Sequence, residues 1–262
     1  MEITKDNIKT VTVAPEYIKK PLTFNDSVVM QINIKYPDIK ILPTVLYHKI
    51  EKKINVFYSA VIKNFINFCE KKLYKSAAAE YWAYKNTKNA ERTEEKDETE
   101  ETEIKENDYI FKPFGAVVTF EVAYNKEDFL CIYLDMNIYA GKGRGNSVRK
   151  AHIWKISSGE LLAPARFIKF TRQFKSKICR YIYETMENQI KRGEEYYIKS
   201  DMPSIYRYLN MKNFYLSENG YSFFFPQNTL ASAENGIVSF EVPEKAVSAF
   251  LSSNKKAEKK LI

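Results

Sequence analysis

A stretch of alternating hydrophobicity beside three closely spaced glycines constrains the fold more than any other part of the chain. Every second residue from Leu130 to Ile138 is apolar, which is typical of a strand with one buried face. A second strand is expected over 148–156. The segment between the two strands holds three of the eight glycines of the chain: Gly141, Gly143 and Gly145. Since glycine adopts positive φ without strain, we expect a tight loop joining two antiparallel strands.

Periodic segments elsewhere predict an α+β fold. Further strands are expected over 28–37, 118–124, 213–217, 221–225 and 237–242. Helical spacing runs from Leu46 to Phe68 and from Phe167 to Ile182, with Lys and Arg on the opposite arcs. A further helical piece, 76–90, either extends the first helix or folds back on the sheet. We therefore expect an antiparallel sheet packed by two long amphipathic helices, in two subdomains.

Five segments are expected along the 262 residues. Residues 1–25 should form a loosely attached arm, with at most a short strand from Val11 to Val13. Residues 26–90 and 109–251 should form the two subdomains, and 252–262 a charged tail. Residues 91–108 should be an acidic mobile loop, because 91–106 carries nine acids, three bases and almost no apolar side chains. That loop could instead cover the basic body as a lid.

Charge and hydropathy bound the possible partners. The acidic segment carries −6 of a net charge of +8, so the rest of the chain carries +14 and should attract anionic partners. The alternative is that the lysines only keep the protein in solution. No run approaches the roughly 18 to 20 apolar residues of a membrane span, and the opening residues lack a secretory signal. We therefore expect a cytoplasmic protein with reduced, buried cysteines at Cys69, Cys131 and Cys179.

Catalytic and cofactor chemistry is not expected. The only histidines, His48 and His152, lie at no metal-ligand spacing, so we expect neither a metal nor another cofactor. His152 should be a packed core or edge histidine. There is no nucleophile motif and no carboxylate pair that the sequence singles out, which argues against an enzyme. The glycine loop opens a strand rather than a helix, so it does not predict a phosphate cradle.

Two binding surfaces are predicted instead. The first is the end of the central hairpin, where cations lie beside aromatic residues and could hold a protein or an anionic polymer: Tyr139, Lys142, Arg144, Arg149, Lys150 and Trp154. The alternative is that these charges only protect the end of the hairpin from pairing. The second hypothesis is a nucleic-acid surface that combines the hairpin with a basic helix: Arg166, Lys169, Arg172 and Arg180.

Short motifs in the order of the predicted elements resemble the RsiV-like family. These are 28–37, Ile54-Asn55, 120–125, 139–145, 158–161, 213–216, 220–226 and 236–243. That family comprises the extracytoplasmic domain of the anti-sigma factor RsiV and the accessory domain of PdaC-type peptidoglycan deacetylases. The resemblance covers about residues 28–251 and implies an α+β fold with a non-catalytic binding or sensory role in a bacterial protein.

The chain also departs from the family pattern. Family members typically read Gly-Gly-Ala-His-Gly in the central loop, whereas this chain has Lys142, Gly143 and Arg144 at the second to fourth positions. Any role of that histidine is therefore absent. The family usually lies outside the cell behind an anchor that this sequence does not show. RsiV is a receptor for lysozyme, and a body of charge +14 is a poor electrostatic complement to that basic ligand.

Overall fold

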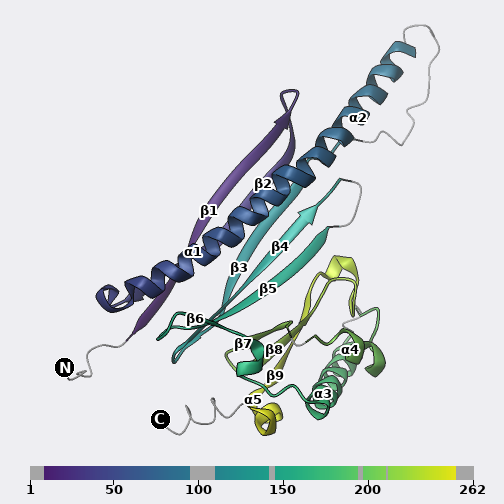
Figure 1. The fold of residues 1–262 in the computed structure, drawn as a ribbon. Helices are drawn as coiled ribbons and strands as arrows, with labels where there is room; N and C mark the ends of the chain where they lie inside the picture. The colour runs from purple at the N-terminus through teal and green to yellow at the C-terminus, as the bar shows by residue number, and fades with distance from the viewer. Residues whose placement is uncertain (1–8, 95–109, 142–144, 194–196, 211, 252–262) are drawn as a thin grey trace.

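The computed structural model describes residues 9–94, 110–141, 145–193, 197–210 and 212–251, with the backbone alone for 89–94 (Figure 1). The described strands form a six-stranded sheet in the order β1-β2-β3-β4-β5-β6 and a three-stranded sheet in the order β7-β8-β9. Helices pack against both sheets, so the α+β class predicted from the sequence is confirmed.

The large sheet is mixed rather than purely antiparallel. Its strands are β1 (Thr10–Phe24), β2 (Ser27–Leu42), β3 (Phe114–Lys126), β4 (Phe129–Tyr139), β5 (Asn146–Lys155) and β6 (Glu160–Leu162). All neighbours pair antiparallel except β2 and β3, which run parallel from Met30↔Phe114 to Ile34↔Val118. Parallel neighbours need a long crossover connection, and the helices between β2 and β3 supply it.

The first strand corrects the prediction of a loosely attached arm. β1 pairs with β2 over its whole length, from Thr10↔Leu42 to Phe24↔Ser27. Asn25 and Asp26 close this hairpin with φ of 48° and 59°, as a two-residue turn between twisted strands requires. None of the β1 side chains is fully buried. An edge strand of this kind has only a weak alternation of apolar and polar residues, which is why its sequence reads as an arm.

One long helix covers a face of the large sheet (Figure 1). It consists of α1 (Thr44–Phe68), a π-helical turn (Cys69–Leu73) and α2 (Tyr74–Glu94), so the second helical piece extends the first. The buried side chains of α1 are Ile54, Tyr58, Ile62 and Phe65. Leu46 and Phe68, which the periodicity placed inward, are largely exposed. The predicted apolar face was therefore wrong at both ends of α1.

Side chains of α1 also complete the backbone pairing of β2. Beyond Ile34 this strand has no pairing with the described residues of β3. There Asn55 accepts from the Ile39 amide at 2.9 Å and donates to the Ile39 carbonyl at 2.8 Å. Glu51 accepts from the Ile41 amide at 2.9 Å. Because unpaired backbone groups are costly when water is excluded, these contacts fix the helix on the strand.

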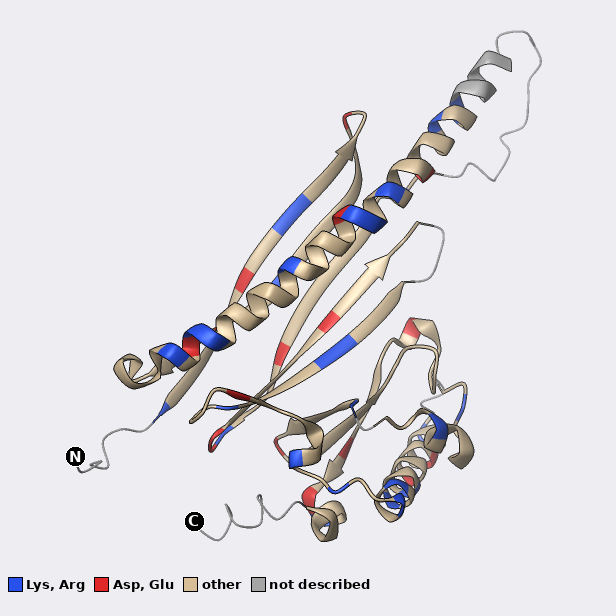
Figure 2. Cartoon of the chain, in the orientation of Figure 1, with Lys and Arg blue, Asp and Glu red and all other residues tan. Residues whose placement is uncertain are grey.

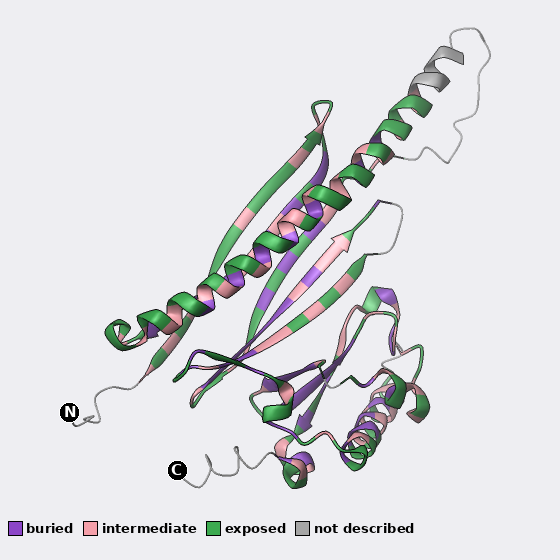
Figure 3. Cartoon of the chain, in the orientation of Figure 1, coloured by how far each residue is buried: buried purple, intermediate pink, exposed green. Residues whose placement is uncertain are grey.

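The two hydrophobic clusters meet at β4, whose buried residues stand out in Figure 3. Leu130, Ile132, Leu134 and Met136 belong to the cluster under α1 and α2. Phe129, Cys131 and Tyr133 belong to the cluster shared with the C-terminal layer. Successive side chains of a strand point to opposite faces, so one strand contributes to both cores.

The C-terminal layer contains β7 (Phe214–Ser217), β8 (Gly220–Phe225) and β9 (Val238–Pro243), with α3 (Arg172–Lys191), α4 (Met202–Tyr208) and α5 (Glu244–Val247). β7 contacts β3, β4 and β5, and α3 packs its apolar face on β9 and α4. The strands predicted over 213–217 and 221–225 pair with each other as β7 and β8, and the pair Ser217↔Gly220 leaves Glu218 and Asn219 as the turn. The helix predicted from Phe167 begins later, at Arg172, where the Thr171 hydroxyl accepts from the Phe174 amide at 3.1 Å.

The described residues cover only part of the remaining predictions on domain organisation. Residues 91–94 of the predicted acidic loop belong to α2, and the rest of that loop up to 108 lies outside the described residues, as does the tail 252–262. The sheet contains β2 from the first predicted subdomain and β3–β6 from the second. The two predicted subdomains therefore share one sheet. The division between them at 109 stays a prediction.

Candidate functional site

The glycine segment lies at the end of the β4–β5 hairpin. The two strands pair antiparallel from Phe129↔Lys155 to Ile138↔Asn146, as predicted from their alternation. Gly141 has a φ of 61°, and a Cβ there would lie 2.6 Å from the carboxylate oxygens of Glu80 on α2. The positive φ therefore favours glycine at this position, and the Glu80 carboxylate lies directly against it. Residues 142–144, with the predicted contacts Lys142 and Arg144 and the glycine Gly143, lie outside the described residues.

The other side of the hairpin end is bound to the C-terminal layer through one side chain, that of Gln227. Its Oε1 accepts from the Ser147 amide at 2.8 Å. Its Nε2 donates to the carbonyls of Gly145 at 2.9 Å and Ala233 at 2.7 Å. The Ser147 hydroxyl in turn donates to Asn137 Oδ1 at 2.6 Å. The first residues of β5 are thus held in place from both layers.

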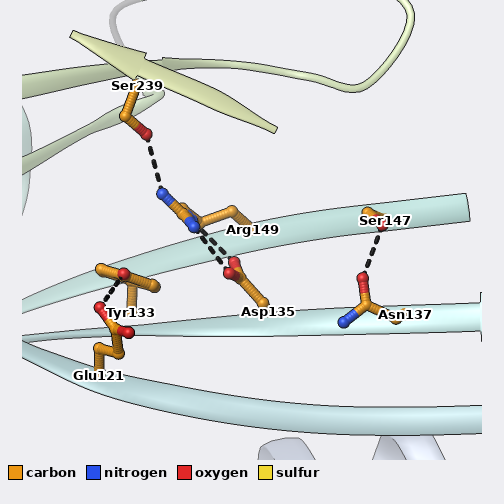
Figure 4. A network of polar contacts seen from close by, with 7 residues as sticks. All are labelled: Glu121, Tyr133, Asp135, Asn137, Ser147, Arg149 and Ser239. Atoms are coloured by element: carbon orange, nitrogen blue, oxygen red, sulfur yellow. Dashed lines mark hydrogen bonds and ion pairs between the residues drawn. The ribbon is translucent and has the colours of Figure 1, made fainter. Parts of the chain in front are cut away.

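Arg149 occupies the middle of a polar network between the layers (Figure 4). Its Nε and Nη2 donate to the two carboxylate oxygens of Asp135, each at 2.7 Å, and its Nη1 donates to Ser239 Oγ at 2.9 Å. The guanidinium carbon lies 4.0 Å from the centre of the Tyr133 ring. The Arg149 and Asp135 side chains are 11% and 23% exposed. Burial opposes the charge on Arg149, but the Asp135 carboxylate overrides it and raises the pKa of Arg149.

Tyr133 extends this network toward β3. Its hydroxyl donates to the Glu121 carboxylate, and its ring lies 5.0 Å from the Tyr215 ring of β7. Burial raises the pKa of Tyr133 first, and the bond to Glu121 adds to the effect. The phenol therefore stays protonated and serves as a donor. Because these contacts connect β3, β4 and β5 with β7 and β9, the network is a junction between layers.

Two predicted contact residues are thereby corrected. Arg149 faces the C-terminal layer and binds Asp135 and Ser239 instead of projecting from the hairpin. Trp154 is 2% exposed, and its Nε1 donates to the Tyr58 hydroxyl at 3.2 Å in the core under α1. The reason is the same in both cases: each face of β5 is covered by a different layer. Asp135, Gln227 and Ser239 were missed as partners, although the register Asp135↔Arg149 places opposite charges across one strand pair.

Of the predicted contact and loop residues, Tyr139, Gly145 and Lys150 are both described and exposed. Lys150 lies on the opposite face of β5 from Arg149. His152 lies two residues further along β5, on the same face as Lys150. Its ring packs edge-on against the Phe57 ring, with 4.9 Å between the ring centroids. Burial, assisted by the charge of Lys150, lowers the pKa of His152 to about 4. His152 is therefore the neutral, packed histidine that was expected, and among described residues its Nδ1 has no hydrogen-bond partner.

The predicted nucleic-acid contacts lie in the C-terminal layer. Arg166 is in a short 3-10 helix (Pro164–Arg166), Lys169 lies in the following link, and Arg172 and Arg180 are on α3; all four are exposed. Between 161 and 183 the chain has six Lys and Arg and no acid. Figure 2 shows that α3 lies well apart from the hairpin end. The two surfaces that were expected to act together are therefore separate.

A hollow of about 600 Å³ lies on the basic face of α3. Its described lining comes from this helix alone: Arg172, Gln173, Ser176, Lys177 and Arg180. Since a single helix presents a convex surface, these five side chains do not enclose a ligand by themselves. They form a basic surface that an extended anion could follow.

Reactive groups elsewhere are sparse in the described part of the chain. The three cysteines are buried and free, as expected, and burial raises the pKa of Cys69 and Cys179 to about 11 and of Cys131 to about 12. Among the described residues no group of three or more His, Cys, Asp and Glu could hold a metal ion. None of the described helices has the length and apolar character to cross a bilayer.

The C-terminal layer is similar to a known family. Residues 166–245 match the family described as Protein of unknown function (DUF3298). The matched segment begins in the short 3-10 helix and ends just after β9, so it contains α3, α4 and the small sheet. No curated protein matches the chain.

Solved structures extend the similarity to almost the whole chain. A DUF3298 family member from Bacteroides fragilis is 14% identical, with a TM-score of 0.57 and 95% of each chain covered. A DUF3298 family protein from Pseudomonas aeruginosa is 9% identical, with a TM-score of 0.53, and the match covers 95% of this chain and 97% of that one. At these identities the likeness establishes a shared fold, in which the segment that matches the family model is accompanied by the large sheet and its helix.

Proposed function

We propose that the chain is a non-catalytic binding module of the RsiV-like kind, which recognises a protein or an anionic polymer at the end of the β4–β5 hairpin. The observation that carries the proposal is the way this end is held. Gly141 lies against Glu80 of α2, and Gln227 of the C-terminal layer binds the backbone of Gly145 and Ser147. A loop fixed at its base loses less conformational entropy on binding, which favours affinity.

The residues assigned to recognition differ from the set predicted from the sequence. Tyr139 is exposed at the end of β4 beside the loop, Lys150 is exposed further along β5 opposite Leu134, and Lys142 and Arg144 add two cations in the sequence between them. Arg149 has a supporting role because its guanidinium is bound by Asp135 and Ser239. Cations beside an aromatic ring suit an anionic ligand, through charge and stacking. The Arg149 guanidinium is engaged by Asp135 and Ser239 within the protein, which supports a structural rather than a catalytic role for it.

The second candidate is a nucleic-acid surface on α3. It is favoured by the run of six basic residues without an acid between 161 and 183. Such a surface would act in the cytoplasm, the compartment expected from the sequence, whereas RsiV-like domains act outside the cell. Nucleic-acid binding by phosphate contacts falls steeply with salt, in proportion to the phosphates neutralised.

Binding of fluorescent polyphosphate and of a labelled DNA duplex to the full chain, followed by anisotropy at low and high salt, tests both candidates. One variant combines Lys142→Ser, Arg144→Ser and Lys150→Ser; its matched control combines Arg172→Ser, Lys177→Ser and Arg180→Ser. Each removes three positive charges. We expect the hairpin variant to raise the Kd by about tenfold or more and the α3 variant to change it by about threefold at most.

A larger rise in Kd for the α3 variant than for the hairpin variant would favour the nucleic-acid surface on α3. Unchanged Kd values for both variants would exclude both surfaces as polyanion sites. If the wild-type chain binds neither probe at low salt, the anionic-polymer form of the proposal is wrong, and only a protein ligand at the hairpin end remains.

A further inference from the structure

The start of α1 carries an exposed aliphatic surface that the proposed function does not use. Val45 is 93% exposed, Leu46 is 61% exposed, and Leu42, at the end of β2, is 52% exposed. The three residues lie within five positions of the chain, at the end of the large sheet (Figure 1). Exposure of branched aliphatic side chains to water is unfavourable, so three neighbouring exposed ones indicate a contact surface.

Lysines surround this aliphatic surface. Lys40, Lys49, Lys52 and Lys53 are all exposed, and none of them forms an ion pair with another described residue. Val45, Lys49, Lys52 and Val56 follow each other at intervals of four, three and four residues, so they lie on one face of α1. Figure 2 shows several Lys and Arg positions along α1.

The same face lacks negative charge. The only acid of α1 is Glu51, whose carboxylate is turned inward to accept the Ile41 amide at 2.9 Å. Apart from Thr44 and His48, the exposed side chains near the start of α1 are therefore aliphatic or basic. Such a surface complements a partner that offers negative charge and an apolar interior together.

We propose that the aliphatic and lysine residues at 40–56 form a docking surface for an anionic lipid bilayer. Lysines would meet the phosphate headgroups, while Leu42, Val45 and Leu46 enter the apolar boundary below them. Long lysine stems let the charge stay in the headgroup layer as the apolar part sinks. Nucleic acid would use the lysines but leave the aliphatic side chains in water, and protein interfaces are depleted in lysine.

Vesicle co-sedimentation of the full chain tests the proposal. The vesicles contain phosphatidylcholine alone or phosphatidylcholine with roughly one third phosphatidylglycerol. We expect the wild type to sediment with the anionic vesicles at low salt and to be released as salt screens the lysines. Val45→Ser/Leu46→Ser should raise the lipid concentration for half-maximal binding by about tenfold or more. Ile198→Ser removes a comparably exposed apolar side chain in the other layer and should have no effect.

A second variant separates the charge from the apolar contact and guards against loss of fold. Lys49→Gln/Lys52→Gln/Lys53→Gln should abolish the preference for anionic vesicles while the melting temperature stays at the wild-type value. The proposal is overturned if the wild type ignores anionic vesicles at low salt, or if the serine variant binds them as well as the wild type does. An equal loss of vesicle binding in Ile198→Ser would also overturn it. So would competition of a DNA duplex with the vesicles, if DNA binding were unaffected by Val45→Ser/Leu46→Ser.

Discussion

The guanidinium of Arg149 is held by both oxygens of Asp135 and by Ser239, and it lies over the Tyr133 ring. A bidentate pair of this kind, shielded from water on most sides, is more strongly coupled than an exposed ion pair. Among single residues, Arg149 therefore contributes to the position of the hairpin end rather than to its recognition surface.

Replacing Arg149 tests this role. Arg149→Met leaves the Asp135 carboxylate partly buried without its partner, and we expect the free energy of unfolding to fall by about 2 to 3 kcal/mol. The matched control is Lys150→Met on the next residue, whose side chain is exposed on the other face; it should change stability by about 0.5 kcal/mol at most. Urea denaturation measures both. Equal midpoints for the two variants would contradict the assignment.

At the scale of single elements, α1 is positioned by polar contacts as well as by its apolar face. Asn55 binds both backbone groups of Ile39, and Glu51 binds the amide of Ile41, in the part of β2 beyond its pairing with β3. A side-chain amide offers one donor and one acceptor in the geometry of a peptide group, so Asn55 substitutes for a neighbouring strand. Apolar spacing alone would not set this register.

Removal of the Asn55 amide should therefore destabilise the fold. In Asn55→Ala both backbone groups of Ile39 lose their partner, at an expected cost of about 1 to 3 kcal/mol in the free energy of unfolding. Asn64→Ala, on the exposed side of the same helix, should be close to neutral because alanine has the higher helix propensity. Thermal and urea denaturation of the two variants distinguish these outcomes; a destabilisation by Asn64→Ala of equal size would show that the Ile39 contacts contribute nothing.

At the scale of the whole molecule, β4 joins the two cores. Leu134 lies in the cluster under the long helix and Phe129 in the cluster of the C-terminal layer, on opposite faces of the same strand. Loss of either layer would expose one face of β4 and remove half of the packing that holds it. We therefore expect the two layers to unfold together.

Two core substitutions test this cooperativity. Leu134→Ala and Phe129→Ala should each lower the free energy of unfolding by about 2 to 5 kcal/mol. In both variants the transition seen by tryptophan fluorescence should coincide with that seen by far-ultraviolet circular dichroism, because Trp154 reports on one core and the backbone on both. Separate transitions in either variant would mean that the layers are independent folding units.

Local patterns were enough for much of the fold. The alternation over Leu130–Ile138 predicted β4, the glycines predicted the β4–β5 loop, and helical spacing predicted α1 and α3 approximately. Each of these patterns reflects a burial that repeats with the period of one element, so it can be read without knowing the partner. The strands over 213–217 and 221–225 were predictable for the same reason.

By itself the sequence determined most of the strands from β2 onward and the approximate spans of α1 and α3, because those choices depend on neighbours within a few residues. Only the tertiary structure decided that β1 pairs along β2, that β2 and β3 run parallel, and that the two faces of β5 turn Arg149 and Trp154 into the protein. These outcomes depend on which layer covers which face, and that is settled by contacts between residues far apart in the chain.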